Sequence, residues 1–156
     1  MDAPSIGPYA DDGQISDDTL LVRRVRPQWV HWNETSPSGQ WPRISSQNFQ
    51  DYNQEMAERA GCPAPAMSVA VLAIFRAHRN NDEELLIGYE GYGLALITAG
   101  DVRALQQGVT MWPNEDEPWH ALVFSKSTRI KSVGTRSRLA EAAVWLRRPI
   151  RLEHGQ

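Results

Sequence analysis

The sequence contains a single cysteine, Cys62, so it offers no pair from which an internal disulfide could form. Cys62 lies in a segment of small residues and prolines, residues 60–65, with no cation close by in the sequence. A reactive thiol needs a neighbouring positive charge or a similar stabilising group, so a structural thiol is favoured. The four histidines fit no HxH, HxxxH or HExxH spacing, and we predict no metal site and no cofactor.

Long apolar runs are also missing, because no stretch approaches the length that spans a bilayer. The first residues are acidic, whereas a signal peptide begins with a basic segment followed by an apolar one. We therefore expect a cytoplasmic protein without a membrane partner.

The sequence has no excess of positive charge, because it contains 16 Lys and Arg residues and 19 Asp and Glu residues. The net charge of -3 argues against a general nucleic-acid binder, which needs a basic surface for phosphate contacts. Residues 126–138 (KSTRIKSVGTRSR) nevertheless carry only positive charges. This segment is either a solvated face or a weak nucleic-acid contact, and the first interpretation is favoured.

The length of 156 residues suits one domain with its own core. Residues 1–18 are polar, contain Pro4 and Pro8, and show neither helical nor strand periodicity. We predict a disordered tail over 1–18 and a single domain over 19–156.

Alternating and apolar segments predict strands at residues 20–25, 67–75, 94–98 and 121–124. For 67–75 a helix continuing to His78 stays open, and 94–98 is either a strand or the buried start of a helix. Helices are expected near 45–52, 83–89, 102–107 and 135–145; Asp101 is expected to cap the third, with Gly108 after its end. The predicted fold is α+β: one compact domain with a small mixed or antiparallel sheet, a few short helices and a C-terminal amphipathic helix.

His120 is the best candidate for chemistry, because it stands at the start of an apolar strand and an imidazole titrates near neutral pH. A general acid or base of this kind needs an orienting carboxylate, for which Glu90 and Glu117 are candidates. Arg24 or Arg43 would bind an anionic group. The alternative is a structural histidine at a strand edge, which is the commoner case.

Nucleophilic catalysis would require a hydroxyl beside that base, and Ser45, Ser46 and Ser68 are the candidates. No GxSxG motif is present. Residues 91–93 form a GxG without the third glycine of the dinucleotide fingerprint, and residues 99–101 read as a structural helix cap.

Tryptophan is unusually frequent, with six residues against three Phe and four Tyr. Several of them flank polar loops, and tryptophan is favoured at contact surfaces. The candidate binding residues are Trp29, Trp41, Arg43, Trp112 and Trp119. The alternative is that these rings cover the core of a small domain.

Four segments together resemble a group of small bacterial single-domain proteins to which no activity is assigned. They are RISSQNFQD (43–51), MSV (67–69), ITAGDVR (97–103) and EPWHALV (117–123). The resemblance implies one compact bacterial domain over about 20–145 and transfers no catalytic role.

A fainter likeness is to small enzymes of the ADP-ribosyltransferase type, which arrange an early Arg, a Ser on a strand and a later Glu around NAD. Arg24, Ser46 or Ser68, and Glu90 occur here in that order. The leading hypothesis is a cytoplasmic accessory module that binds a protein partner through its Trp-bearing loops. The alternatives are a small enzyme that uses His120, with this likeness as one form of it, and a weak nucleic-acid binder.

Overall fold

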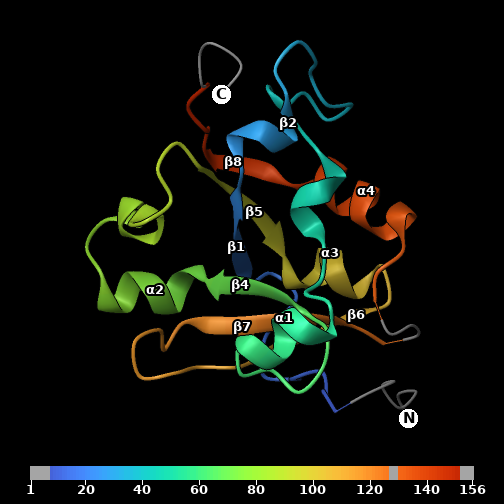
Figure 1. Cartoon of the computed structure of the whole chain (residues 1–156), viewed down its shortest axis with the longest axis vertical. Coiled ribbons are helices and arrows are strands. Elements are labelled where there is room, and N and C mark those ends of the chain that lie inside the picture. Colours follow the sequence, from blue (N-terminus) through green and yellow to red (C-terminus); the bar gives the residue numbers. More distant parts are fainter. Residues whose placement is uncertain (1–7, 127–129, 152–156) are drawn as a thin grey trace.

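A computed structural model of the chain describes residues 8–126 and 130–151. Its main feature is a six-stranded antiparallel sheet in the order β6-β7-β4-β1-β5-β8 (Figure 1). These strands are β1 (Leu20–Val25), β4 (Met67–Val71), β5 (Gly93–Thr98), β6 (Gln107–Met111), β7 (His120–Ser125) and β8 (Val144–Arg147). A separate two-stranded sheet pairs β2 (Val30–His31) with β3 (Arg43–Ile44).

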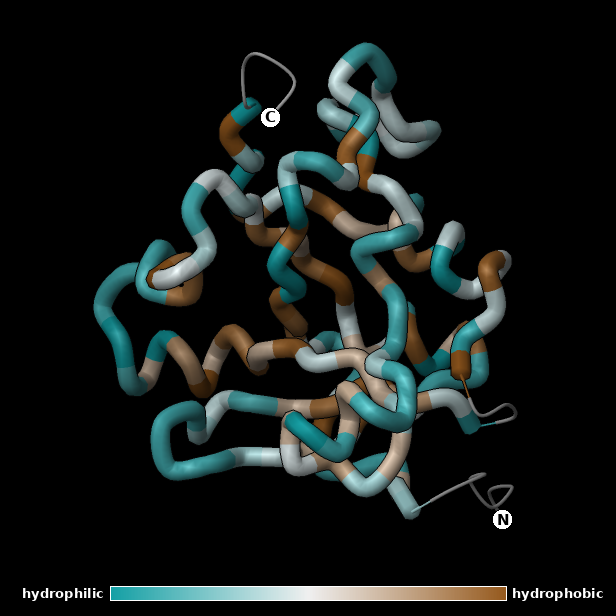
Figure 2. Tube along the Cα trace, viewed as in Figure 1, coloured by the Kyte–Doolittle hydropathy of each residue, from teal (hydrophilic) through white to brown (hydrophobic). Residues whose placement is uncertain are grey.

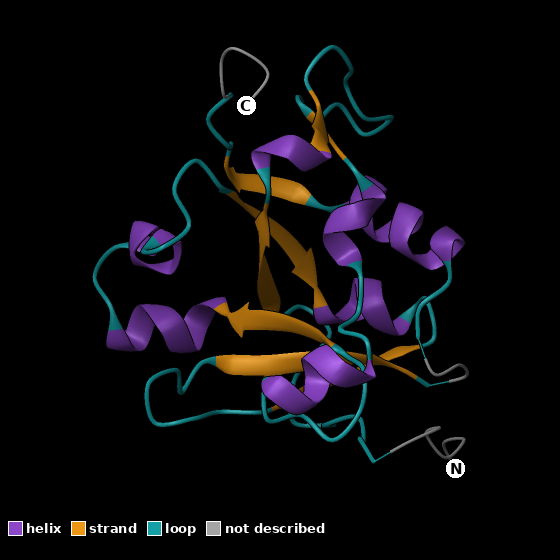
Figure 3. Cartoon of the chain, viewed as in Figure 1, coloured by secondary structure: helices purple, strands orange, loops and turns teal. Residues whose placement is uncertain are grey.

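Short helices lie on both sides of the sheet (Figure 3). The described residues form the α-helices α1 (Gln54–Arg59), α2 (Leu72–His78), α3 (Ala99–Arg103) and α4 (Val133–Ala142). They also form the 3-10 helices η1 (Pro27–Trp29), η2 (Ser46–Phe49) and η3 (Asp82–Leu86). The α+β prediction of one compact domain is confirmed, and all the strand pairings in the described sheets are antiparallel.

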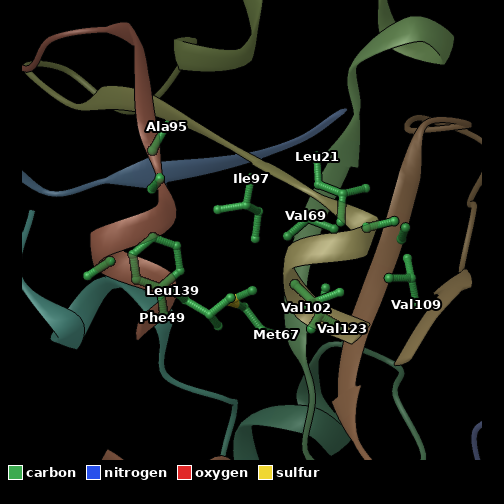
Figure 4. Close-up of a cluster of buried hydrophobic side chains, with 14 of the residues drawn as sticks. Leu21, Phe49, Met67, Val69, Ala95, Ile97, Val102, Val109, Val123 and Leu139 are labelled. Atoms are coloured by element: carbon green, nitrogen blue, oxygen red, sulfur yellow. The ribbon is translucent and has the colours of Figure 1, made fainter. Parts of the chain in front are cut away.

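The largest apolar core lies on the first face of the sheet, beneath η2, α3 and α4 (Figure 4). Strand residues such as Leu21, Val69 and Ile97 meet Phe49 of η2 and Leu139 of α4 there. All of these side chains are almost inaccessible to water. Figure 2 shows the hydrophobic stretches concentrated in the central strands and the hydrophilic ones in the outer loops.

The second face carries two smaller apolar clusters instead of one. The first lies over β1, β4 and β5, where α2 and η3 contribute Phe75 and Leu85. The second lies over β7, where Ala57 of α1 packs with Leu122 and Phe124. Polar side chains occupy the strand positions between the two clusters, and these positions form the candidate site.

In the described part of the predicted tail over 1–18, the chain packs on the domain from Tyr9 onward. Tyr9 is 5% exposed and its hydroxyl donates to the carbonyl oxygen of Ala64 at 2.5 Å. Arg103 of α3 binds Asp11 and Asp17. These contacts join residues 8–18 to the domain; residues 1–7 lie outside the described part.

Several helix boundaries differ from the predicted ones. The helices predicted near 45–52 and 83–89 are the shorter 3-10 helices Ser46–Phe49 and Asp82–Leu86. The apolar segment from Met67 is a strand to Val71 and then the helix α2. Helix α3 is capped by Thr98, whose hydroxyl accepts from the Asp101 N–H, while the Asp101 carboxylate accepts from the Thr98 N–H. Asp101 thus belongs to a capping box three residues into the turn, and the helix starts earlier than predicted.

The predicted helix over 135–145 ends at Ala142, because Val144–Arg147 forms β8 and pairs with β5. Gly108 follows no helix end either; it lies inside β6, opposite Phe124. A Cβ at Gly108 would lie 2.4 Å from Cζ of Phe124, so the aromatic ring occupies the space of the missing side chain. Among the described residues, no helix is long and apolar enough to cross a membrane.

Candidate functional site

The register of three neighbouring strands brings polar side chains together on the second face of the sheet. Val22 of β1 is opposite Ala70 of β4, and Ala70 is opposite His120 of β7. Side chains alternate along a strand, so Ser68, two residues from Ala70, shares this face with His120. Arg24, two residues from Val22 on β1, shares this face by the same alternation.

His120 is held by hydrogen bonds at both ring nitrogens. Its Nδ1 lies 2.7 Å from the carbonyl oxygen of Trp112, and its Nε2 is hydrogen-bonded to Oγ of Ser68. A carbonyl oxygen only accepts, so Nδ1 carries the proton. In the neutral ring Nε2 is then an acceptor, and the Ser68 hydroxyl donates to it. This is the relative arrangement of nucleophile and base in serine catalysis, with a backbone carbonyl in the orienting position.

These two side chains line a cavity of about 350 Å³ that also receives Arg23, Arg24 and Arg26. Its other walls come from η1, from the residues after η2, from the segment between η3 and β5 and from the loop before β7. They include Trp29, Asp51, Tyr52, Tyr89, Tyr92 and Glu117. A second, more open cavity of about 470 Å³ shares Arg24, Ser68, Glu117 and His120 with the first. The two therefore form one groove that has Ser68 and His120 at its middle.

The arginines of the groove are bound to carbonyl oxygens and aromatic rings. Arg23 donates to the carbonyl oxygens of Asn48 and Ser68 at 2.8 and 2.7 Å. Burial lowers the pKa of Arg23, and the positive charge of Arg24 acts in the same direction. Arg24 donates to the carbonyl oxygen of Leu85 at 2.6 Å, and its guanidinium lies 4.1 Å from the ring centre of Tyr89.

Asp51, on the wall of the cavity, is paired with Lys131 just before α4. Its carboxylate accepts from the Lys131 backbone N–H at 2.7 Å and from the Lys131 ammonium group. The two side chains are 3% and 0% exposed. Burial lowers the pKa of Lys131 to about 8, although the Asp51 charge opposes this shift. Lys131 is the ion-pair partner of Asp51, and the Asp51 charge also acts on Arg23, where it opposes the lowering of the pKa by burial.

The structure brings together three of the four residues predicted for catalysis. His120, Glu117 and Arg24 line the groove. Glu90 is exposed in the turn before β5 and is not among the residues that line it. The Arg–Ser–Glu set of the ADP-ribosyltransferase type is therefore not assembled around Glu90.

The other candidate serines lie apart from His120. Ser45 caps η2, and Ser45 and Ser46 line a small separate cavity beside α4. Ser68 is therefore the candidate nucleophile that the described structure pairs with His120.

The predicted binding residues do not form one surface. Trp29 lines the groove and lies under the guanidinium of Arg26 at 4.6 Å. Trp119 is 6% exposed and packs edge to face on Phe75. Trp112 is half-buried and contacts Tyr9.

Trp41 and Arg43 belong to the loop and strand at β3. Trp41 is 45% exposed, and Arg43 forms an ion pair with Glu34 at 3.2 Å.

The basic segment 126–138 is partly used inside the protein. Lys126 pairs with Asp11 at 3.0 Å, and Lys131 is buried against Asp51. Residues 127–129 lie outside the described part. Two of its cations are thus already neutralised, which lowers the positive charge that a nucleic acid would meet.

Sequence reasoning missed Asp51, Lys131, Tyr89 and Tyr92 as members of this region. Each lies in a polar segment without periodicity. The neighbouring sequence of a turn tyrosine or of a single buried lysine does not indicate that the residue belongs to a site. The tyrosines share the loop around the Gly91 turn, so only the fold relates them to His120.

Within residues 8–126 and 130–151, no three His, Cys, Asp or Glu side chains are grouped as a metal site would require. Comparisons with protein-family models, with curated proteins and with solved structures found no match to this chain.

Proposed function

We propose that the protein is a small hydrolytic enzyme that cleaves an anionic ester, with Ser68 as nucleophile and His120 as general base. The observation that carries the proposal is the hydrogen-bonded series from Ser68 Oγ to His120 Nε2, with His120 Nδ1 fixed on the Trp112 carbonyl oxygen, at the middle of a groove. A histidine that only tied two strands together would have no need of a cavity beside it.

The first half of the reaction forms a covalent intermediate on Ser68. Oγ of Ser68 bonds to the electrophilic atom of the ester while His120 Nε2 takes the hydroxyl proton. The bond to the leaving oxygen then breaks, and the His120 proton passes to that oxygen, so an alcohol departs. Arg24, which lines the same cavity as Ser68, stabilises the negative charge that develops on the ester oxygens.

The second half regenerates the enzyme with one water molecule. His120 Nε2 takes a proton from water as the water oxygen bonds to the same electrophilic atom. The bond to Ser68 Oγ breaks, and the proton returns from His120 to Ser68. The net reaction is ester plus water giving acid plus alcohol, with no other reactant.

A fluorophosphonate reagent tests this proposal, because it reacts covalently with an activated serine. We expect one equivalent per chain by intact mass, mapped to Ser68 by peptide analysis. Ser68→Ala abolishes the labelling, and His120→Ala slows it by about 100-fold or more.

Ser46→Ala is the matched control, since Ser46 is a half-buried serine of η2 away from His120, and it is expected to label at the wild-type rate. Thermal unfolding of each variant checks that the fold is retained. Labelling that proceeds equally fast in His120→Ala, or that maps elsewhere, contradicts the proposal.

A second candidate is protein binding through the aromatic loop between β2 and β3. Trp41 is 45% exposed there, although its indole N–H is fixed on the Trp32 carbonyl oxygen. Val144 of β8 is also exposed, at 41%. This function predicts a purified partner whose binding is retained at high salt, weakened in Trp41→Ala and unaffected by Ser68→Ala. If partner binding were instead weakened in Ser68→Ala and unaffected by Trp41→Ala, the function would be assigned to the groove.

A further inference from the structure

We propose that the substrate of the groove is a nucleotide, with its phosphate ester group between Arg24 and Ser68 and its base against the rings of Tyr89 and Tyr92. The inference rests on the proposed function for the position of the reacting bond. The binding of the nucleotide itself follows from charge and aromatic contacts that exist whether or not Ser68 reacts.

The arginines of the groove form no ion pair with a carboxylate among the described residues. Other arginines of the chain, such as Arg76 and Arg103, are paired with carboxylates. Arg23, Arg24 and Arg26 line one cavity, and no carboxylate of the described residues lies within ion-pair distance of them. Guanidinium groups gathered without carboxylate partners favour an anion, and their planar donor pattern matches phosphate oxygens.

The groove is also polarised along its length. Glu84 and Asp116 line only its more open cavity, together with Arg79, and Arg23 and Arg26 line only the other cavity. Arg24 and Glu117 line both. The arginine end is the cavity that Asp51 shares, and Asp51 is paired with Lys131. A phosphate is therefore directed toward the cavity that the three arginines line, and Ser68 lines the same cavity.

Aromatic rings adjoin this anion site directly. Arg24 covers the ring of Tyr89 at 4.1 Å, and the rings of Tyr89 and Tyr92 are 5.2 Å apart. Both tyrosines line the same cavity as Ser68. Because one guanidinium touches both the anion position and an aromatic ring, a ligand that combines a phosphate with a flat base can occupy both at once. Base stacking on aromatic side chains tolerates any of the bases.

Isothermal titration of the full chain with adenosine monophosphate tests the proposal. The titration uses Ser68→Ala, so that binding is measured without turnover. We expect saturable binding that weakens with salt, and at least tenfold weaker binding of both adenosine and inorganic phosphate. Arg24→Gln and Tyr92→Ala are each expected to weaken the binding of adenosine monophosphate by tenfold or more.

Arg76→Gln is the matched control, because Arg76 is an arginine outside the groove that pairs with Asp82, and it should leave the affinity unchanged. Thermal unfolding confirms that each variant is folded. Inorganic phosphate binding as tightly as the nucleotide, or equal losses in Arg24→Gln and Arg76→Gln, would overturn the nucleotide assignment.

The two proposals fail separately. Ser68 labelling without nucleotide binding would retain the hydrolase and reject the nucleotide. Nucleotide binding without labelling of Ser68 would retain the ligand and reject the nucleophile.

Discussion

The carboxylate of Asp51 and the ammonium group of Lys131 form an ion pair that water does not reach, since their side chains are 3% and 0% exposed. At the scale of single residues this is a buried contact at the wall of the groove, because Asp51 lines the cavity. It fixes the chain after η2 to the residues before α4 through two hydrogen bonds to one carboxylate. Removing either partner leaves a buried group without compensation.

We predict that Asp51→Asn and Lys131→Met each lower the free energy of unfolding by about 3–5 kcal/mol. The double variant should lose less than the sum of the two single variants, because neither unpaired charge then remains. Urea denaturation of the wild type, the two single variants and the double variant measures these free energies of unfolding. The control is Glu55→Gln, which removes the exposed pair with Arg59 on α1 and should change stability little. Additive losses in the double variant would contradict the coupling.

At the scale of elements, the sequence indicated those strands whose apolar residues are adjacent in the chain. β1 was predicted at its observed bounds, and β7 starts one residue before the predicted 121–124 and ends one residue after it. Both strands are largely buried, so their composition alone marks them.

Boundaries set by distant partners were not predictable in the same way. The chain forms β8 from Val144 because it pairs there with β5. The sequence pattern through residue 145 is helical and does not show that a strand is available for pairing. The sequence pattern predicted Gly108 as the residue that follows a helix end. In the structure a glycine is needed there because the Phe124 ring of the neighbouring strand occupies the space of a side chain. The non-glycine residue with positive φ among the described residues is Gln106, just before β6, and no sequence rule favours glutamine there.

The same distinction applies to the candidate site: one of its residues could be predicted from its sequence neighbours, and its contacts depend on strand pairing. His120 could be selected from its own neighbours, since it precedes an apolar strand. Its relation to Ser68 depends on the β4–β7 register, and its relation to Arg24 depends on the β1–β4 register. A shift of one residue in either register would turn the side chains to the opposite face. The chemistry of this region is therefore a property of three paired strands.

At the scale of the whole molecule, residues 8–18 connect parts of the domain that are far apart in sequence. The Asp11 carboxylate accepts from the Val109 N–H at 2.9 Å and pairs with Arg103 and Lys126. It thus links α3, β6 and the end of β7 to the segment that precedes β1. Polar composition suggested a tail, but each of these polar groups has a specific partner in the folded chain.

Asp11→Asn is expected to reduce the free energy of unfolding at pH 7 by roughly 1–3 kcal/mol, since it removes charge-assisted hydrogen bonds. Asp12→Asn is the matched control, because the Asp12 carboxylate binds only the nearby Gln14 N–H among the described contacts. It should change stability much less. Thermal or urea unfolding of both variants beside the wild type measures the difference.

The same comparison predicts a pH dependence. Burial acts to raise the pKa of Asp11, but the hydrogen bonds from Val109, Arg103 and Lys126 outweigh it and hold the pKa below its ordinary value of 3.8. The unfolded chain therefore takes up the proton first as the pH falls. The stability that Asp11 supplies is complete above that ordinary value and is lost as the pH falls through the lower folded-state pKa. The wild-type and Asp11→Asn curves should accordingly converge below about pH 4, and a gap that stays constant down to pH 3 would show that the carboxylate charge does not hold this segment in place.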